Sequence, residues 1–222
     1  MTVRSCALLM PVALSLVSAA PVLADGDIWL YAQNGQLKTG VIDEIPSEDR
    51  SEGVRVFHAE LGTDVDNAID EPGLRVLVGG LDPAGELSFT INRALRVWNG
   101  SAFDALSVHT MTVGFDTLSV DSPTTDAPVD GFGVGIDADG DLHDHYEFLL
   151  NAPTRTQGIW LLDLTFHFTG LQSADPVWVL FSQDLGEEAV EPAKAWAVAN
   201  VPTPGALALL GVGGLLAMRR RR

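Results

Sequence analysis

The sequence has 222 residues, with 13 Lys or Arg against 30 Asp or Glu, so its formal net charge at pH 7 is −17. Five of the basic residues, Arg4 and Arg219 to Arg222, lie near the two ends, which leaves eight against all 30 acids and a charge of −22 between them. Such a surface repels nucleic acid and anionic lipid, which excludes a nucleic-acid-binding function and suits a salty or cation-rich exterior.

The first 24 residues have the pattern of a secretory signal peptide. A single early cation, Arg4, precedes the apolar stretch ALLMPVALSLV, and small residues follow up to Ala24. This order of parts predicts export and cleavage by signal peptidase after Ala24. Cys6, the one cysteine of the sequence, would leave with the peptide. We therefore expect residues 25–200 to hold no disulfide, no thiolate nucleophile and no cysteine-ligated metal.

Residues 25–200 have the length of one domain, which is enough chain for a hydrophobic core. Two short runs of strand-forming residues flank Asn34-Gly35, a pair typical of tight hairpins, and Asn99-Gly100 predicts another turn. Gly, Pro, Asp and Asn recur about every ten residues, as they do in sandwiches and barrels. The sequence therefore predicts an all-β fold, either an antiparallel β-sandwich or a jelly roll.

An acidic segment, GIDADGDLHDHYEFLL, is the first candidate for chemistry. Its aspartates surround one glycine, Gly140, and are Asp137, Asp139, Asp141 and Asp144. Alternate carboxylates around a glycine resemble the loops that hold Ca²⁺, although the spacing differs from that of the EF-hand. An acidic hairpin turn without an ion explains the same residues. The sequence leaves both interpretations open.

Residues 143–150 have the alternation of a strand whose large apolar side chains point inward. His143, His145 and Glu147 would then share the outer face. Antiparallel pairing with residues 159–168 would place His143 opposite His167. Three imidazoles within cross-strand reach could bind Zn²⁺ and leave open positions for water. A solvated polar face, which a half-buried sheet needs anyway, is the interpretation that the sequence favours.

The clearest strand of the chain is GIWLLDLTFHF, residues 158–168. One face of this strand is predicted to be polar, with Asp163, Thr165 and His167. The other face is apolar and consists of Trp160, Leu162, Leu164, Phe166 and Phe168. After it, only EEAVEPAKAWAVA has a helical composition, and Pro192 is expected to interrupt that helix.

The last 22 residues combine a short proline motif, an apolar segment and a basic cluster. The apolar segment from Gly205 to Met218 is predicted to form a helix, but it is shorter than the ~20 residues of a comfortable bilayer span. The four arginines after it, Arg219, Arg220, Arg221 and Arg222, are predicted to stop transfer and keep this end in the cytoplasm. We therefore expect this apolar segment to anchor the protein in the membrane only temporarily.

This order of parts, behind a signal peptide, resembles the PEP-CTERM sorting signal of bacterial exosortase substrates. That family usually carries Val-Pro-Glu-Pro, and the corresponding residues here are Val201, Pro202, Thr203 and Pro204. The resemblance covers residues 201–222 only. It implies that an exosortase-type membrane protease cuts near the motif and releases the domain to the cell surface or the extracellular polysaccharide matrix.

We therefore expect an exported, non-enzymatic protein with a structural or adhesive role. One alternative is a Ca²⁺-dependent module that binds exopolysaccharide through exposed aromatic side chains and aspartates 137–144. A second alternative is a metal-dependent enzyme centred on His143, His145 and His167. An exposed tryptophan beside the acidic segment would favour the module, and a concave pocket around the three histidines would favour the enzyme.

Overall fold

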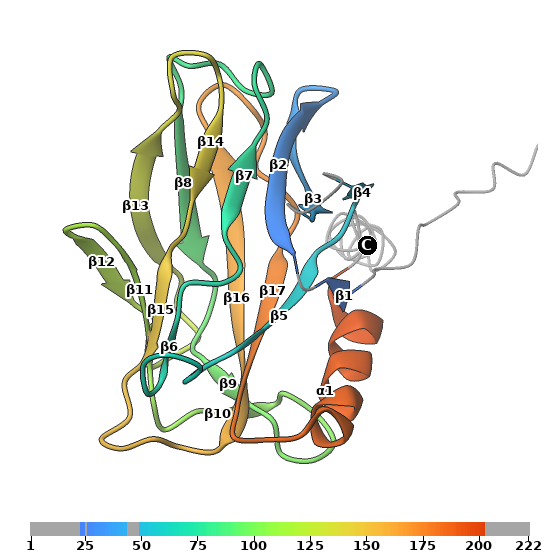
Figure 1. Ribbon diagram of the computed structural model, residues 1–222, viewed down its shortest axis with the longest axis vertical. Coiled ribbons are helices and arrows are strands. Elements are labelled where there is room, and N and C mark those ends of the chain that lie inside the picture. Colours follow the sequence, from blue (N-terminus) through green and yellow to red (C-terminus); the bar gives the residue numbers. More distant parts are fainter. Residues whose placement is uncertain (1–22, 25, 44–48, 203–222) are drawn as a thin grey trace, which may run out of the picture.

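The computed structural model describes residues 23–24, 26–43 and 49–202 (Figure 1). Most of the predicted signal peptide, the apolar segment after Pro204 and the arginine cluster lie outside these residues. Within them the chain is mostly β-sheet with one helix, so the prediction of an all-β fold is confirmed at that level.

An eight-stranded sheet forms the larger layer of the fold. Its main path runs β1-β5-β17-β16-β8-β13, and the short strands β9 and β10 attach beside β16. The strands are β1 (Leu23–Ala24), β5 (Val56–Glu60), β8 (Glu86–Ile91), β9 (Arg96–Val97), β10 (Ala105–Leu106), β13 (Val129–Gly135), β16 (Gly158–Phe168) and β17 (Val177–Gln183).

Two smaller sheets lie against one face of the large sheet (Figure 1). The five-stranded sheet has the order β14-β7-β2-β3-β4, with β2 (Asp27–Gln33), β3 (Gln36–Ile42), β4 (Arg50–Glu52), β7 (Leu74–Val76) and β14 (Leu142–Asp144). The four-stranded sheet has the order β12-β11-β15-β6, with β6 (Ala68–Ile69), β11 (Met111–Phe115), β12 (Leu118–Asp121) and β15 (Glu147–Leu150).

The main hydrophobic core fills the space between the two layers. The predicted apolar face of β16 lies in it, so that prediction is confirmed for Trp160, Leu162, Leu164, Phe166 and Phe168. Each of these side chains is at least 95% buried, and together with residues of the two smaller sheets they remove apolar surface from water.

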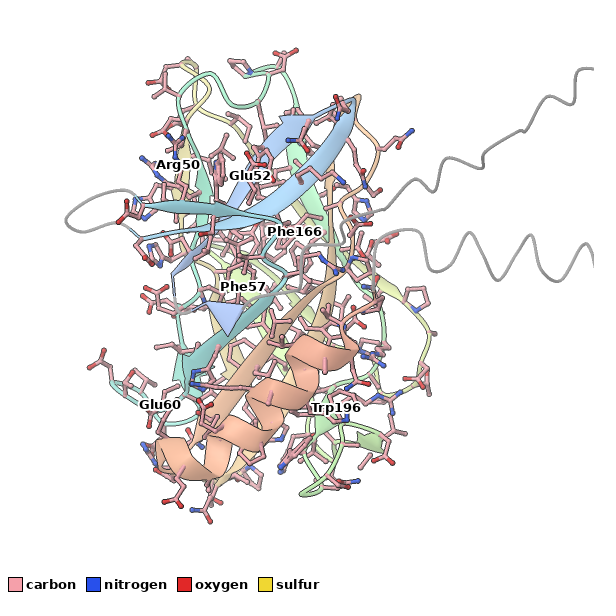
Figure 2. All side chains as sticks on the ribbon, turned by 90° about the vertical axis from the view of Figure 1, so that its right-hand side faces the viewer. Arg50, Glu52, Phe57, Glu60, Phe166 and Trp196 are labelled. Carbon is pink, nitrogen blue, oxygen red and sulfur yellow. The ribbon has the colours of Figure 1, made fainter. Side chains whose placement is uncertain are left out.

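The opposite face of the large sheet is covered in part by helix α1 (Glu187–Asn200), which crosses it in Figure 2. Ile159 and Leu161 of β16 are therefore buried on this side as well, which explains why β16 is apolar on both faces at its start. The helix continues through Pro192, contrary to the expected interruption. Proline removes one backbone hydrogen bond, and the burial of Val190 and Ala197 against the sheet offsets that loss.

The Asn34-Gly35 hairpin is confirmed. It joins β2 and β3 with Gln33 opposite Gln36, and its two residues have φ of 52° and 77°, as a type I′ turn requires. Most strand pairs are antiparallel, as expected for the predicted β-sandwich, but β5 runs parallel to β17 and β2 runs parallel to β7. Parallel neighbours need long crossover connections, which turn spacing alone does not reveal.

Candidate functional site

The structure separates the two strands that were predicted to pair. Strand β14 pairs with β7, and β15 pairs with β11 and β6, so both belong to the smaller sheets. Strand β16 pairs with β17, β8 and β9 in the opposite layer. The predicted pairing of residues 143–150 with 159–168 is therefore wrong. Both edges of β16 are occupied by other strands, and matching apolar faces could not distinguish a neighbour in the sheet from a partner across the core.

His167 consequently does not join the other two histidines. It lies opposite Ser88 in the large sheet, and its ring nitrogens contact Thr90 Oγ1 at 2.9 Å and Ser173 Oγ at 2.7 Å. Both nitrogens thus have hydroxyl partners within the fold. The structure removes His167 from the predicted three-histidine group.

His143 and His145 do lie together, and a residue that the sequence analysis missed completes the group. The Nε2 atoms of the two histidines are 3.1 Å apart, and His143 Nε2 lies 3.4 Å from Asp27 Oδ2. One ligand atom from each of Asp27, His143 and His145 falls within 4.8 Å of the others. Among the residues that the structure describes, this is the group of three or more His, Cys, Asp or Glu side chains placed to hold a metal ion.

The strand register explains why Asp27 and His145 come together, and His143 lies two residues before His145 in the chain. Ile28, Leu74 and Asp144 are opposed across β2, β7 and β14. The adjacent row is therefore Asp27, Gly73 and His145. Residues in such a row are separated by the spacing of strands, about 4.8 Å per strand.

Gly73 stands between the two side chains and lets them approach. A Cβ atom at this position would lie 2.6 Å from Asp27 Oδ1 and 2.9 Å from His145 Cε1, closer than real Cβ contacts allow. The missing side chain leaves the gap in which a carboxylate and an imidazole from the flanking positions come together. The alternation of side chains along β2 could have predicted that Asp27 lies on the outer face of the sheet. Only the order of the strands in the sheet places it beside the histidines.

The Asp27 carboxylate is 5% exposed, and its two oxygens have different surroundings. Oδ1 accepts a hydrogen bond from the Gly73 backbone N–H at 3.0 Å. Oδ2 is buried and has no hydrogen-bond donor, although His143 Nε2 is 3.4 Å away. A buried carboxylate oxygen without a donor is costly, because nothing replaces the water that it has lost.

The electrostatic surroundings favour positive charge at His145. Burial disfavours a charged imidazole, but the Asp70 carbonyl and the nearby carboxylates of Glu71, Asp27 and Asp70 outweigh burial and raise the pKa of His145. The Asp70 carbonyl lies 3.0 Å from Nδ1, and Glu71 Oε1 lies 3.5 Å from the same atom. Burial also raises the pKa of the Glu71 carboxyl, an effect that its attraction to His145 opposes.

Residues 136–141 of the acidic segment form the turn between β13 and β14, and Asp144 lies in β14. Backbone bonds from Asp137 N to the Asp141 carbonyl, at 3.0 Å, and from Gly140 N to the Asp137 carbonyl, at 2.8 Å, close it. Asp141 is engaged by Arg75, whose Nη1 lies 3.1 Å from Oδ1. Asp139 is exposed, and burial followed by the nearby Asp137 charge raises the pKa of Asp144. In the described part of the chain the four aspartates do not converge as one metal-binding group.

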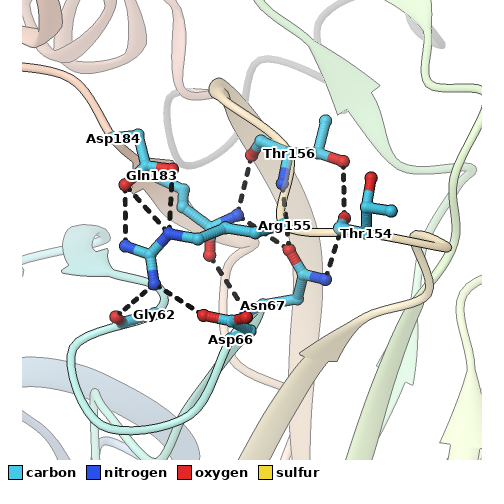
Figure 3. Close-up of polar contacts among 8 residues, drawn as sticks. All are labelled: Gly62, Asp66, Asn67, Thr154, Arg155, Thr156, Gln183 and Asp184. Atoms are coloured by element: carbon cyan, nitrogen blue, oxygen red, sulfur yellow. Dashed lines mark hydrogen bonds and ion pairs between the residues drawn. The ribbon is translucent and has the colours of Figure 1, made fainter.

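A second polar cluster, which the sequence analysis did not single out, is centred on Arg155 (Figure 3). Arg155 donates to Asp184 through Nε and Nη2, at 2.7–3.0 Å, and to Asp66 and the Gly62 carbonyl through Nη1, at 2.8 Å. Beside it the buried Gln183 side chain accepts from Asn67 N at 3.0 Å and donates to Asn67 Oδ1 at 2.8 Å. Its donors and acceptors are matched within the protein, which is the arrangement of a structural cluster.

The tryptophans give little support for a saccharide surface. Trp160 and Trp178 are buried, whereas Trp29, Trp98 and Trp196 are half-buried. Trp29 stacks on Tyr31 with ring centroids 4.3 Å apart, and Arg50 lies over the indole at 5.4 Å. No fully exposed tryptophan lies beside the acidic segment within the described residues.

The described part of the chain ends inside the proline motif, at Pro202. Val201 is 3% exposed and packs in the cluster between α1 and the large sheet, and its N–H donates to the Ala197 carbonyl at 2.9 Å. The buried Arg55 guanidinium donates to the Pro202 carbonyl. Thr203, Pro204 and the arginine cluster lie outside the described residues. Within residues 23–24, 26–43 and 49–202, no helix is long and apolar enough to cross a bilayer.

Neither protein-family models nor curated proteins give a significant match to this chain.

Proposed function

We propose that this chain is an exported protein of the cell surface or extracellular matrix, with a structural or adhesive rather than an enzymatic role. Signal peptidase removes the first 24 residues, and with them the two-residue edge strand β1. The segment from residue 201 to 222 then holds the protein in the membrane until an exosortase-type protease cuts near the Val-Pro-Thr-Pro motif.

The observation that carries this proposal is the packing of Val201 and Pro202 against the domain. Helix α1 ends at Asn200, Val201 is buried, and Arg55 binds the Pro202 carbonyl. The two core clusters are built from residues up to Val201. A protease can therefore remove the rest of the tail without taking apart the domain, which is what a temporary anchor requires.

The same contacts predict where the cut falls. Val201 and Pro202 are part of the packed domain, so a protease reaches the bonds beyond them without unfolding the end of the chain. The released protein should therefore keep Val201 and Pro202, with the Arg55 contact intact.

The experiment replaces Arg219 to Arg222 by Gln in the full-length chain, expressed in a bacterium that carries an exosortase-type protease. Intact-mass measurement of the released protein gives its last residue, and cell fractionation gives its location. The unsubstituted chain should be shortened beyond Pro202 and released. The Gln variant should lose processing or correct sorting, because the positive charge that stops transfer is gone.

A matched variant with Lys at the same four positions keeps the charge and should be processed as the original chain is. Unchanged processing and location of the Gln variant would refute the sorting proposal. Cleavage on the N-terminal side of Val201 would leave sorting intact and refute only the proposed position of the cut.

A metal-dependent enzyme remains the second candidate, now centred on the group of Asp27, His143 and His145 instead of three histidines. The observation in its favour is that three protein ligands leave positions of a four-coordinate metal for water or substrate.

A further inference from the structure

We propose that Asp27, His143 and His145 bind one divalent transition-metal ion of the Zn²⁺ class. This inference does not depend on how the protein is sorted. It rests on the spacing of the three ligand atoms, on the hydrogen atoms that their neighbours permit, and on the buried oxygen that has no donor.

The spacing suits a small ion with a coordination distance near 2 Å. Zn²⁺ binds imidazole nitrogen and carboxylate oxygen at about 2.0–2.2 Å, so ligand atoms at the corners of a tetrahedron lie about 3.3 Å apart. The two measured separations are 3.1 Å between the Nε2 atoms and 3.4 Å from His143 Nε2 to Asp27 Oδ2. These two separations are therefore close to those around a bound ion, and the third, between His145 and Asp27, is within 4.8 Å.

The positions of the hydrogen atoms favour a cation over a closed hydrogen-bond network. His145 Nδ1 faces the Asp70 carbonyl at 3.0 Å, and a carbonyl can only accept, so this nitrogen carries the proton. In neutral His145 the Nε2 atom then carries no hydrogen, and its lone pair points towards His143.

His143 Nε2 has at most one hydrogen to offer, while two acceptors lie within 3.4 Å of it: His145 Nε2 and Asp27 Oδ2. One proton cannot serve both acceptors fully, and Asp27 Oδ2 has no hydrogen bond. A metal ion among the three atoms binds all their lone pairs at once. The cation also balances the carboxylate charge that burial makes costly.

The surroundings supply the outer contacts that orient metal ligands. The Asp70 carbonyl fixes the tautomer and the ring direction of His145. The Gly73 N–H holds Asp27 Oδ1, which leaves Oδ2 turned towards the histidines. Glu71 Oε2 accepts from the same Gly73 N–H at 3.0 Å and adds negative charge near the site. These contacts come from the segment of residues 70–73, which lies between β6 and β7.

The ligand set selects the class of ion. Two imidazoles and one carboxylate suit Zn²⁺ and neighbouring transition metals, whereas Ca²⁺ and Mg²⁺ prefer six or more oxygen ligands. The His143 side chain is about one-third exposed, at 35%, so the ion would be reached from solvent. At least one coordination position therefore remains for water or for a donor atom of a ligand outside the protein.

The test is a Zn²⁺ titration by calorimetry of the full-length chain in detergent, purified without a polyhistidine tag and stripped with a chelator. We expect one Zn²⁺ per chain and no comparable binding of Ca²⁺. His145→Gln and His143→Gln should each weaken binding by more than about 100-fold, beyond the usual effect of outer contacts.

His167→Gln is the matched control, since it removes a histidine that bonds hydroxyl groups in the opposite layer. It should leave Zn²⁺ binding unchanged. Circular dichroism verifies the fold of each variant, and the more exposed His143 provides a test if His145→Gln folds poorly. Absence of 1:1 binding, survival of binding in both site variants, or equal loss in the control would overturn the proposal.

Discussion

Two polar clusters of this domain each combine carboxylates with a buried polar side chain, but they differ in how their hydrogen bonds are satisfied. Around Arg155, five guanidinium bonds reach two carboxylates and one carbonyl, and the adjacent Gln183 is matched with Asn67 and Thr156. Around Asp27, the donors are fewer than the acceptors, and a buried carboxylate oxygen is left without a hydrogen bond. The first cluster is complete as protein, whereas the proposed cation would complete the second.

The difference shows how to separate a structural polar cluster from a binding site in one structure. Charge and burial do not distinguish them, because both contain buried polar groups. The number of donors available to each lone pair does distinguish them. A native fold rarely leaves a buried acceptor without a hydrogen-bond partner unless that acceptor has a functional role. The predictions below act on one cluster at a time.

The largest effect is expected from Gln183→Ala, which should lower the free energy of unfolding by about 3 kcal/mol. The side chain is fully buried, and its loss leaves the Asn67 N–H and the Thr156 carbonyl without their partner. Chemical denaturation measures the change. Metal binding should be unaffected, and a loss of Zn²⁺ affinity would contradict the independence of the two clusters.

Zn²⁺ at about 100 times its dissociation constant should raise the free energy of unfolding by about 2.7 kcal/mol through mass action. Thermal or urea unfolding with Zn²⁺ and with chelator measures this difference. His145→Gln should abolish it, while Arg155→Gln, which alters the other cluster, should keep it. Equal stabilisation of the His145 variant would place the ion elsewhere.

Gly73→Ala should cost about 2 kcal/mol and abolish Zn²⁺ binding, because the new Cβ atom enters the space between Asp27 and His145. Gly135→Ala is the control, since a Cβ atom there meets nothing within 4 Å. Unchanged Zn²⁺ affinity of the Gly73 variant would show that the gap is not needed for the site.

Asp27→Asn should act in opposite directions on stability and on binding. The amide can still accept from Gly73 N–H through its oxygen, and its NH₂ group offers the donor that the histidine nitrogens lack. The metal-free variant is therefore expected to be more stable by about 1 kcal/mol and to bind Zn²⁺ poorly. If the metal-free variant is instead less stable than the original protein, the Asp27 carboxylate already has the partners it needs without a metal ion.

The smallest effect concerns pH and the Arg155 cluster. The hydrogen bonds from Arg155 lower the pKa of Asp184. Stability from this group is therefore present above its unfolded pKa and is lost as pH falls through the folded pKa. In the original protein the denaturant concentration at the midpoint of unfolding should fall as the pH is lowered from 5 to 3, values that bracket the ordinary aspartate pKa of about 3.9. Asp184→Asn should make this fall smaller. An identical pH profile would show that the exposed pair contributes nothing measurable.

Features that depend on neighbours in the chain were predictable from the sequence. The alternation of β16 identified its core face, and Asn34-Gly35 identified the first hairpin. Tyr146, Phe148 and Leu150 point inward as the alternation after His143 indicated. Local periodicity reports which side of a strand is buried, and it does so wherever one face is solvated.

Features that depend on which strands become neighbours were not predictable. The sequence predicted that His143 and His145 lie together. It assigned His167 as the third member of the group because the strand that pairs with β14 was unknown. The true partner, Asp27, lies 116 residues from His143 in the sequence and reaches it only through β7, which runs parallel to β2. The role of Gly73 follows from the same sheet order. No local pattern in the sequence contains that order.

The most direct test of the central claim is crystallography of the Zn²⁺-loaded protein with anomalous data at the zinc absorption edge. The account predicts one strong anomalous peak about 2.0–2.2 Å from Asp27 Oδ2, His143 Nε2 and His145 Nε2. A peak among aspartates 137–144, or none at the Asp27 group in a crystal that contains bound Zn²⁺, would contradict it.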